Sequence, residues 1–312
     1  MSLTGGPLVT GASGFAGGHL VERLLRSHDS VDAWAHAKVP DDAGSDSRLR
    51  WHAVDLTDAA AVERALDAAR PGVIYHCAGL PHVAESWSRA ADALQVNAFG
   101  THVLLEAAAR LGFDPLVVVV SSALVYRPAV EAMSEAHPLG PVDPYGVSKL
   151  AQEMTAQRSR TRTVIARPFN HAGPRQSPSF VTSNFARQVA AIEAGRVEPV
   201  LRVGNLDARR DITDVRDTVR AYESLGASGA ANGPYNVCSG IAHRVGDLLE
   251  SLLRMAKVRV TVQQDPARMR PSDNPVVLGD PSRITSDIGW RAELVIEQTL
   301  RDLLDWWRAH TP

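Results

Sequence analysis

The chain has little of what marks a membrane, secreted or metal-binding protein. It contains two cysteines, Cys77 and Cys238, which lie far apart and without metal-ligand spacing. We therefore expect free thiols in a reducing compartment and no metal site. The longest apolar runs, such as Leu116–Val120, are far too short to span a bilayer, and no basic stretch followed by apolar residues begins the chain. A cytoplasmic protein without a membrane partner is expected.

The chain also has no strong excess of positive or negative charge. The formal net charge is -2 over 312 residues, with 45% apolar and 22% charged residues, which is ordinary for a soluble globular protein. This balance gives no reason to expect nucleic acid as a partner, so an anionic ligand must be held locally by arginines and backbone amides. The length suffices for one large domain with a smaller lobe, or for two modest domains.

Short apolar runs alternate with helical patterns through the first half of the chain. Strands are predicted at residues 7–10, 31–35, 51–54, 73–77, 116–121 and 164–166, with helices at 17–25, 59–68, 92–111 and 145–158. The strand runs show no polar alternation, which indicates that both faces of the sheet are covered. The pattern predicts an α/β fold with a doubly wound parallel sheet of the Rossmann type.

The regular alternation of predicted strands and helices ends in the second half of the chain. We expect a loop at residues 171–184, strands at 234–237 and 258–262, a polar loop at 266–275 and an amphipathic helix at 296–309. These elements predict a smaller C-terminal lobe that cannot be cut cleanly from the first domain. Residues 1–170 are expected to form the Rossmann domain. Residues 171–312 are expected to form mainly the lobe, interleaved with elements that return to the first domain.

A glycine-rich segment follows the first predicted strand and begins the first helix. Gly11 and Gly14 let the backbone turn tightly and approach a pyrophosphate, and Gly17 lets the helix pack close to the sheet. The phosphates then lie on exposed amides at the positive end of the helix. Turns favour glycine in any case, but the position of this segment at the first strand-to-helix turn favours a dinucleotide.

Further candidates stand at the carboxyl ends of other strands. Asp55 follows the third strand and could accept hydrogen bonds from an adenine amino group, whereas Thr57 is expected to cap the following helix. The small residues Cys77, Ala78 and Gly79 end the fourth strand, at the edge where ligands bind in such sheets, and would let a cofactor ribose lie against the backbone.

Tyr145 and Lys149 form the strongest local signal. Residues four apart share a helix face, so we expect the ammonium to lower the pKa of the phenol from about 10 toward a value useful for proton transfer. Ser121 and Ser122 end the fifth strand, and Ser122 could donate a hydrogen bond to a substrate carbonyl oxygen. An exposed helical pair and a serine that satisfies its own turn are the structural alternatives.

Together with Arg167-Pro168-Phe169-Asn170, these motifs resemble the extended short-chain dehydrogenase/reductases that modify nucleotide sugars. The resemblance covers essentially the whole chain. It implies that Tyr145 is the general acid/base, that Lys149 binds the nicotinamide ribose and that Ser122 orients the sugar oxygen. The cofactor contacts implied are Gly11, Ser13, Gly14, Phe15, Ala16, His36, Asp55, Leu56, Cys77, Ala78, Gly79, Asn97, Ser121, Tyr145, Lys149 and Pro168.

Segments of the second half, at residues 167–178, 203–217 and 270–283, resemble the GDP-6-deoxy-D-mannose reductases of that family. The reaction implied is hydride transfer from NAD(P)H to the 4-keto group of a GDP-4-keto-6-deoxyhexose, giving GDP-D-rhamnose (GDP-6-deoxy-D-mannose). Guanidinium groups suit phosphate oxygens, although surface salt bridging is the alternative for any single arginine. The implied substrate contacts are Ser86, Ser122, Asn170, Arg187, Val203, Arg210 and Arg270, of which Asn170, Arg210 and Arg270 hold the diphosphate.

The sequence bears on three other functions. Relatives that dehydrate GDP-mannose carry a glutamate two residues after the catalytic serine or threonine, where this chain has Leu124. A UDP-hexose 4-epimerase remains an alternative because Ser121-Ser122-Ala123 is similar to its serine segment, although epimerases usually have a small or aliphatic residue at the position of His171. A non-enzymatic NADP-binding sensor is the second alternative, and the Tyr145–Lys149 pair argues against it.

Cofactor choice and oligomeric state follow from weaker signals. No acid ends the second strand, where His36 and Lys38 could meet a 2′-phosphate, so NADP is favoured over NAD. The helical patterns at 92–111 and 145–158 carry apolar or alanine-rich positions beyond what one sheet face needs. The resemblance implies that they form a homodimer through a four-helix bundle. The positions concerned include Ala93, Val96, Val103, Leu104 and Ala107.

Overall fold

The computed structural model describes residues 5–36, 38–39, 46–81, 83–228, 233–268 and 274–311. Its centre is a parallel seven-stranded sheet with the order β10-β6-β5-β4-β1-β2-β3. The order reverses between β1 and β4, which is the point where ligands bind in such sheets. The strands are β1 (Leu8–Thr10), β2 (Val31–Ala35), β3 (Leu49–Ala53), β4 (Val73–His76), β5 (Leu116–Val120), β6 (Thr163–Pro168) and β10 (Pro234–Val237).

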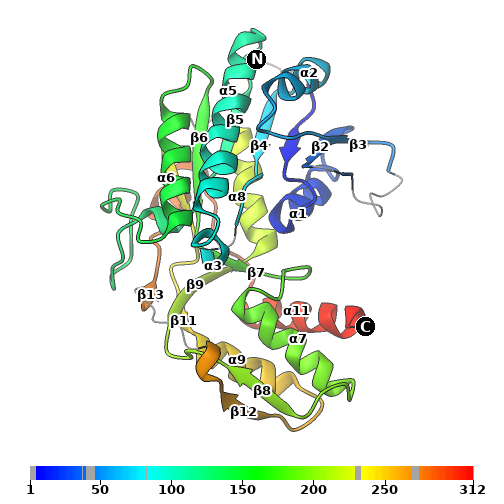
Figure 1. Cartoon of the computed structure of the whole chain (residues 1–312), viewed down its shortest axis with the longest axis vertical. Coiled ribbons are helices and arrows are strands. Elements are labelled where there is room, and N and C mark those ends of the chain that lie inside the picture. Colours follow the sequence, from blue (N-terminus) through cyan, green and yellow to red (C-terminus); the bar gives the residue numbers. More distant parts are fainter. Residues whose placement is uncertain are drawn as a thin grey trace.

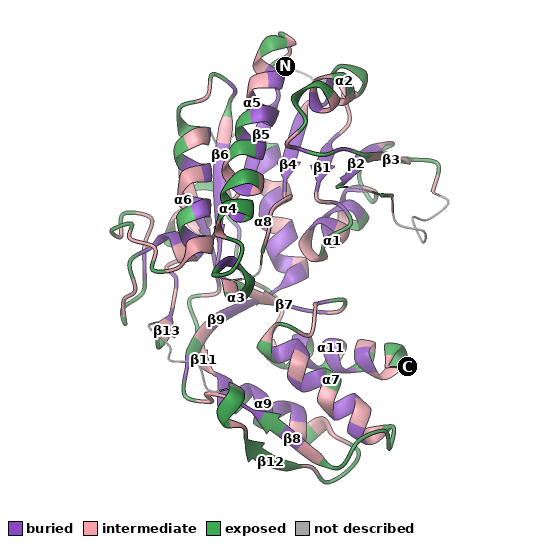
Figure 2. Cartoon of the chain, viewed as in Figure 1, coloured by how far each residue is buried: buried purple, intermediate pink, exposed green. Residues whose placement is uncertain are grey.

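Helices cover both faces of this sheet (Figure 1). Alternate side chains of β5 enter different cores: Val118 packs with one face, and Val117 and Val119 pack with the other. The predicted doubly wound α/β fold is confirmed, and Figure 2 shows the buried strands between the layers. Helices α1 (Phe15–Leu24) and α8 (Val215–Ser228) cover the first face, and α2 (Ala59–Ala69), α5 (Gly100–Arg110) and α6 (Pro144–Gln157) cover the second.

The helix predicted at 92–111 is interrupted. It consists of α4 (Ala90–Leu94), one π-helical stretch η1 (Gln95–Phe99) and α5, preceded by the short α3 (Val83–Ser86). Apolar periodicity alone does not report a π-helical turn, because the insertion changes the backbone hydrogen bonding and leaves the composition unchanged. None of the helices in the described ranges is long and apolar enough to cross a membrane.

Two local predictions were wrong. Asp58, and not Thr57, caps α2: its carboxylate accepts hydrogen bonds from the amides of Ala60 and Ala61, both at 3.0 Å. The loop predicted at 171–184 is shorter at both ends, because β7 (Asn170–Ala172) precedes it and α7 (Val181–Glu193) begins within it. Helix α7 buries one face, which the neighbouring prolines and serines obscured in the sequence.

The smaller lobe gathers at the opposite end of the molecule from α2 and α5 (Figure 1). Its core packs α7, α9 (Val245–Met255) and α11 (Ile296–His310) around β8 (Val200–Val203), which pairs with β12 (Thr261–Gln264). A small sheet of β7, β9 (Arg209–Asp214), β11 (Ala242–Arg244) and β13 (Val276–Val277) joins the lobe to the large sheet. Short helices complete the chain at η2 (Ala123–Val125), η3 (Pro266–Arg268) and α10 (Ser282–Ile288).

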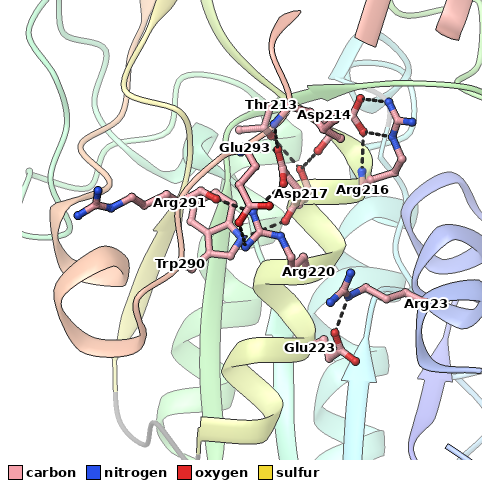
Figure 3. A network of polar contacts seen from close by, with 12 residues as sticks. Arg23, Thr213, Asp214, Arg216, Asp217, Arg220, Glu223, Trp290, Arg291 and Glu293 are labelled. Atoms are coloured by element: carbon pink, nitrogen blue, oxygen red, sulfur yellow. Dashed lines mark hydrogen bonds and ion pairs between the residues drawn. The ribbon is translucent and has the colours of Figure 1, made fainter. Parts of the chain in front are cut away.

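Two buried acids, where β9 leads into α8, hold this junction together (Figure 3). Asp214 accepts hydrogen bonds from Arg216 and from the Thr299 hydroxyl of α11, at 2.8 Å each. Asp217 accepts hydrogen bonds from the amides of Glu293 and Leu294, both at 2.8 Å, in the segment that leads into α11. The C-terminal helix and the segment before it are therefore attached to the end of β9 and to α8 through one carboxylate each.

Candidate active site

A large cavity opens at the carboxyl edge of the parallel strands, between the sheet and the lobe. Its volume is about 1830 Å³, above the roughly 300 to 1,000 Å³ that a single small ligand occupies. The lining comes from the glycine-rich loop, the ends of β2, β4, β5 and β6, helix α6, and the lobe. The space suits two nucleotide-sized ligands that meet near the middle.

The glycine-rich loop crosses the end of β4 at close range. Gly11 has a φ of 68°, and a Cβ there would lie 2.7 Å from the Cα of Ala78. A Cβ on Gly17 would lie 2.1 Å from the carbonyl oxygen of Gly11. The loop therefore requires glycine at both positions, and it brings the first amides of α1 to the cavity. This cradle fits a diphosphate.

One end of the cavity, which we call the adenosine half, is lined by His36, Asp55 and Leu56. Asp55 Oδ1 accepts hydrogen bonds from the amide and the hydroxyl of Thr57, at 2.8 and 2.7 Å. These bonds from Thr57, with the nearby His36, lower the pKa of Asp55. Its other oxygen, Oδ2, lies 3.7 Å from His36 Nε2. An ionised carboxylate thus stands beside a histidine where the ribose and base of a dinucleotide would lie.

Tyr145 stands in the middle of the cavity, in the first turn of α6. Asp143 caps that helix by accepting a hydrogen bond from the amide of Gly146 at 2.8 Å. The Tyr145 amide donates to the buried hydroxyl of Ser86 at 3.1 Å. Ser86, predicted to contact substrate, does not line the large cavity; its hydroxyl contacts the backbone of Tyr145 instead. Both contacts fix the position of the backbone from which the phenol extends.

The phenol of Tyr145 interacts with the hydroxyl of Ser122. Burial raises the pKa of Tyr145 to about 12, and the hydrogen bond with Ser122 opposes this shift. The predicted lowering of this pKa by Lys149 is therefore not found. The ammonium lies 6.0 Å from the centroid of the phenol ring, and the pKa of Tyr145 is set by burial instead. A phenol that stays protonated suits a group that donates a proton.

Lys149 Nζ contacts the end of β5. It donates hydrogen bonds to the carbonyl oxygen of Val120 at 2.8 Å and to Gln152 Oε1 at 3.0 Å. Burial lowers the pKa of Lys149 to about 8. A Cβ on Gly79 would lie 2.6 Å from Asn97 Oδ1 and 3.3 Å from Nζ, so the small residue predicted at the end of β4 leaves room for both side chains.

A chain of buried hydrogen bonds connects Lys149 to β1. Gln152 Nε2 donates to Thr101 Oγ1 at 2.9 Å, and Thr101 uses its own hydrogen on a main-chain carbonyl. His76 Nε2, 2.7 Å from Thr101 Oγ1, must then be the donor, and His76 Nδ1 accepts from Thr10 Oγ1 at 2.8 Å. Burial lowers the pKa of His76 to about 3, so the ring is neutral. The orientation of Lys149 is thereby tied to the sheet.

The remaining cofactor residues from the sequence divide into two groups. Asn97 does not line the cavity: it is buried, accepts a hydrogen bond from the amide of Leu80 at 2.8 Å and donates one to Ser148 at 2.8 Å. The Ser121 hydroxyl faces away from the cavity toward Glu153. Those that line the cavity are Gly11, Ser13, Gly14, Phe15, Ala16, His36, Asp55, Leu56, Cys77, Ala78, Gly79, Ser121, Tyr145, Lys149 and Pro168.

The lobe side of the cavity is lined by Asn170, Val203 and Arg210. Arg210 donates to the carbonyl oxygens of Arg209 and Pro275, at 2.8 and 3.2 Å, and burial lowers its pKa. An anion beside this guanidinium would offset that desolvation. Of the other substrate residues predicted, Arg187 is exposed on α7 and does not line the cavity, and Arg270 lies outside the described residues.

The structure adds residues to this site to which the sequence assigned no role. His171 lines the cavity and stacks on Phe15, with ring centroids 5.7 Å apart and planes at 6°; burial lowers the pKa of His171. Thr182 lines the cavity from α7 and Tyr222 from the middle of α8. In the sequence, Tyr222 is one tyrosine within an amphipathic helical pattern. Such a pattern does not distinguish a tyrosine of the core from one that contacts a ligand.

The glycine cradle and the Ser122–Tyr145–Lys149 arrangement on this sheet define an extended short-chain dehydrogenase/reductase. The chain belongs to the GDP-mannose 4,6-dehydratase family within that class, whose model matches residues 8–303. It is similar to the GDP-6-deoxy-D-mannose reductase of Pseudomonas aeruginosa, with 38% identity over 308 residues that cover 96% of each chain.

Solved structures agree with this placement. The structure of RMD from Pseudomonas aeruginosa complexed with NADPH superposes with a TM-score of 0.85 at 34% identity, covering 97% of this chain and 99% of that one. A UDP-glucose 4-epimerase from Bacillus subtilis is 28% identical over 330 residues, covering 96% of each chain. The reductase, by these measures, is more similar in sequence than the epimerase.

Proposed function

We propose that the protein is an NADPH-dependent reductase that converts GDP-4-keto-6-deoxy-D-mannose to GDP-6-deoxy-D-mannose (GDP-D-rhamnose). The observation that carries this proposal is the pair of hydroxyls, Ser122 and Tyr145, that faces the cavity beside an aliphatic Leu124. The likeness to the Pseudomonas aeruginosa reductase over nearly the full length supports the choice of substrate.

Each residue of the site then has a separate role in the reaction. NADPH, when bound, supplies the hydride that is added to C4 of the sugar. Ser122 donates a hydrogen bond to the ketone oxygen and stabilises the negative charge that develops there. Tyr145 transfers its proton to that oxygen, which completes the C4 hydroxyl, and the tyrosinate takes up a proton from solvent. Lys149 holds the ribose next to the reacting carbon.

Dehydration would require another group. Removing water from GDP-mannose needs a carboxylate that takes the proton next to the ketone, and no glutamate lines the cavity in the described part of the chain. Three aspartates do line it, and two of them are engaged elsewhere: Asp143 caps α6 and Asp92 pairs with Arg89 at 2.7 Å. Asp55 lies in the adenosine half. Reduction is the chemistry that these residues support.

The preference for NADPH over NADH is supported by the adenosine half. His36 is exposed at the end of β2, where a 2′-phosphate would lie, and no carboxylate follows that strand directly. The neighbouring structure of RMD contains NADPH. NAD remains the alternative cofactor, since the structure of MoeE5, 31% identical with a TM-score of 0.85, contains NAD.

A homodimer through α5 and α6 is part of the proposal, on different residues from those first expected. Val103, Leu104 and Ala107 pack inside the chain against α2 and cannot form an outer face. Large apolar side chains are exposed instead at Phe99, which precedes α5, and at Met154 on α6. Light scattering should give twice the chain mass of 33.6 kDa for the native protein, and Met154→Lys should shift it toward one chain.

A cytoplasmic location is also proposed. Cys77 and Cys238 are free thiols, and burial raises the pKa of Cys77 to about 12. Unpaired cysteines are typical of proteins in a reducing compartment.

Nucleotide specificity tests the proposed function. A ligand that binds only the folded state raises the melting temperature in proportion to its occupancy. GDP should therefore stabilise the protein well above UDP at equal concentration, with CDP and TDP as further comparisons. A larger shift with UDP would replace the reductase with the second candidate, a UDP-hexose 4-epimerase.

A further inference from the structure

The hydroxyl of Tyr222 has no hydrogen-bond partner among the described residues, although it is fully buried. Buried tyrosine hydroxyls are normally paired, because a polar group without a partner away from water costs free energy. Tyr222 also lines the large cavity. A buried, unpaired hydroxyl at the wall of a ligand cavity is the arrangement expected of a group whose partner arrives with the ligand.

Tyr222 approaches the cavity from the face of the sheet opposite to Tyr145. Helix α8 packs with α1 on one face, whereas α6 covers the other. Tyr222 lies in the middle of α8, which packs against β4, β5 and β6, and it lines the cavity at the carboxyl edge of these strands. It belongs to the core against which Phe15, Cys77 and Val120 pack.

The neighbours of this hydroxyl show which half of the cavity it faces. Burial raises the pKa of Tyr222, and electrostatic interactions with Cys77 and Tyr145 add to that shift. These groups stand at the end of β4 and the start of α6, beside Lys149. The adenosine half, at His36, is at the other end of the lining. Tyr222 therefore faces the half in which the nicotinamide would lie.

We propose that Tyr222 is a cofactor-binding residue whose hydroxyl forms a hydrogen bond with the carboxamide of the nicotinamide ring. This inference rests on the proposed function. The glycine-rich loop fits the diphosphate and Lys149 the ribose, which leaves the carboxamide as the polar group of that end to be matched. A carboxamide offers both a donor and an acceptor, and a phenol can complement either. The contact also fixes the rotation of the ring, and hence the face that meets the ketone.

The test compares two ligands on Tyr222→Phe by calorimetry. NADPH carries the nicotinamide, and 2′-monophosphoadenosine 5′-diphosphoribose has the same adenosine, diphosphate and ribose without it. The variant should bind NADPH about tenfold more weakly, the effect of losing one hydrogen bond, and should bind the shorter ligand with an unchanged Kd. Without ligand, its melting temperature should stay the same or rise, because the lost hydroxyl had no partner to leave behind.

Tyr235→Phe is the matched control. Its hydroxyl donates to Asp287 at 3.1 Å, and neither residue lines the cavity, so that variant should keep the wild-type Kd for both ligands. An unchanged Kd for NADPH in Tyr222→Phe would overturn the proposal, as would an equal loss for both ligands or a lower melting temperature without ligand. Failure of the wild-type protein to bind NADPH at all would instead contradict the proposed function.

Discussion

Tyr145 and Lys149 share one face of α6, as their spacing predicts, but burial gives them separate tasks. The phenol, with a pKa raised to about 12, stays protonated, and the ammonium, with a pKa lowered to about 8, is the group that titrates near neutrality. The sequence identified both residues and not these shifts. Depth of burial comes from the whole fold, and the nearest contacts of Nζ are Val120 and Gln152, not the phenol.

The pH profile of reduction should follow Lys149. Because Tyr145 stays protonated, kcat/KM should be constant near pH 7 and fall as the pH rises through about 8, where Lys149 loses its charge. Gln152→Glu places a carboxylate against the ammonium and should move this fall to higher pH. Gln152→Leu, which adds no charge, is the control. Initial rates that stay constant up to pH 10, or that fall on the acidic side, would refute the assignment.

Lys149 should also cost the unliganded protein stability. Its folded pKa of about 8 lies below the ordinary 10.5, so the unfolded chain binds the proton more tightly. The penalty is fully present below pH 8 and is relieved as the pH rises toward 10.5. It amounts to at most about 3 kcal/mol. Relative to wild type, Lys149→Met should therefore melt higher at pH 7 than at pH 10, and a melting series between these values measures the change.

At the scale of elements, the regular strands and amphipathic helices of the first half were predictable and special turns were not. β2 (Val31–Ala35) and β10 (Pro234–Val237) have the predicted bounds. The π-helical stretch η1 (Gln95–Phe99) was missed, and with it the reason that Asn97 faces Leu80 and not the cavity. Its cause is backbone hydrogen bonding, which leaves no compositional trace.

Helix α6 and strand β6 are joined by a buried ion pair that should dominate their stability. Arg167 donates to both oxygens of Glu153, at 2.9 and 2.6 Å, and neither side chain is more than 3% exposed. Removing one partner of a buried pair typically costs about 3 to 5 kcal/mol. Glu153→Gln should lower the denaturant midpoint accordingly. The same change at exposed Glu250 on α9 should leave it unchanged, and equal midpoints for the two variants would contradict the account.

At the scale of the whole molecule, the sheet domain was predictable and the attachment of the lobe was not. The alternation of apolar strand runs with helical patterns is by itself enough to predict a doubly wound sheet, and the connecting residues do not change that prediction. The lobe depends on contacts between distant segments, such as Thr299 with Asp214 and the amides at Glu293 with Asp217. No local pattern reports such pairs, which is why most of the helices and strands of the second half were missed.

Asp217→Asn should loosen this attachment. The carboxylate accepts two amide hydrogen bonds from the segment before α11 and one from Arg220, and losing its charge should destabilise the protein by about 2 kcal/mol. Hydrogen exchange should show faster exchange at Glu293 and Leu294, with little change in β4 and β5. Asp247→Asn, at an exposed position on α9, is the control. Uniformly faster exchange throughout the sheet would show that the junction is not a separate unit.

The central claim is that Tyr145 donates the proton in reduction of a GDP-linked 4-ketosugar. Single-turnover oxidation of bound NADPH by GDP-4-keto-6-deoxy-D-mannose, followed by absorbance, tests it most directly. Tyr145→Phe keeps the ring and should slow this step by about a hundredfold to ten-thousandfold with binding nearly intact. Ser122→Ala should slow it less, since one hydrogen bond to the oxygen is lost and the proton is not. A Tyr145→Phe rate of even about a third of wild type would contradict the account and make His171 the next acid to test.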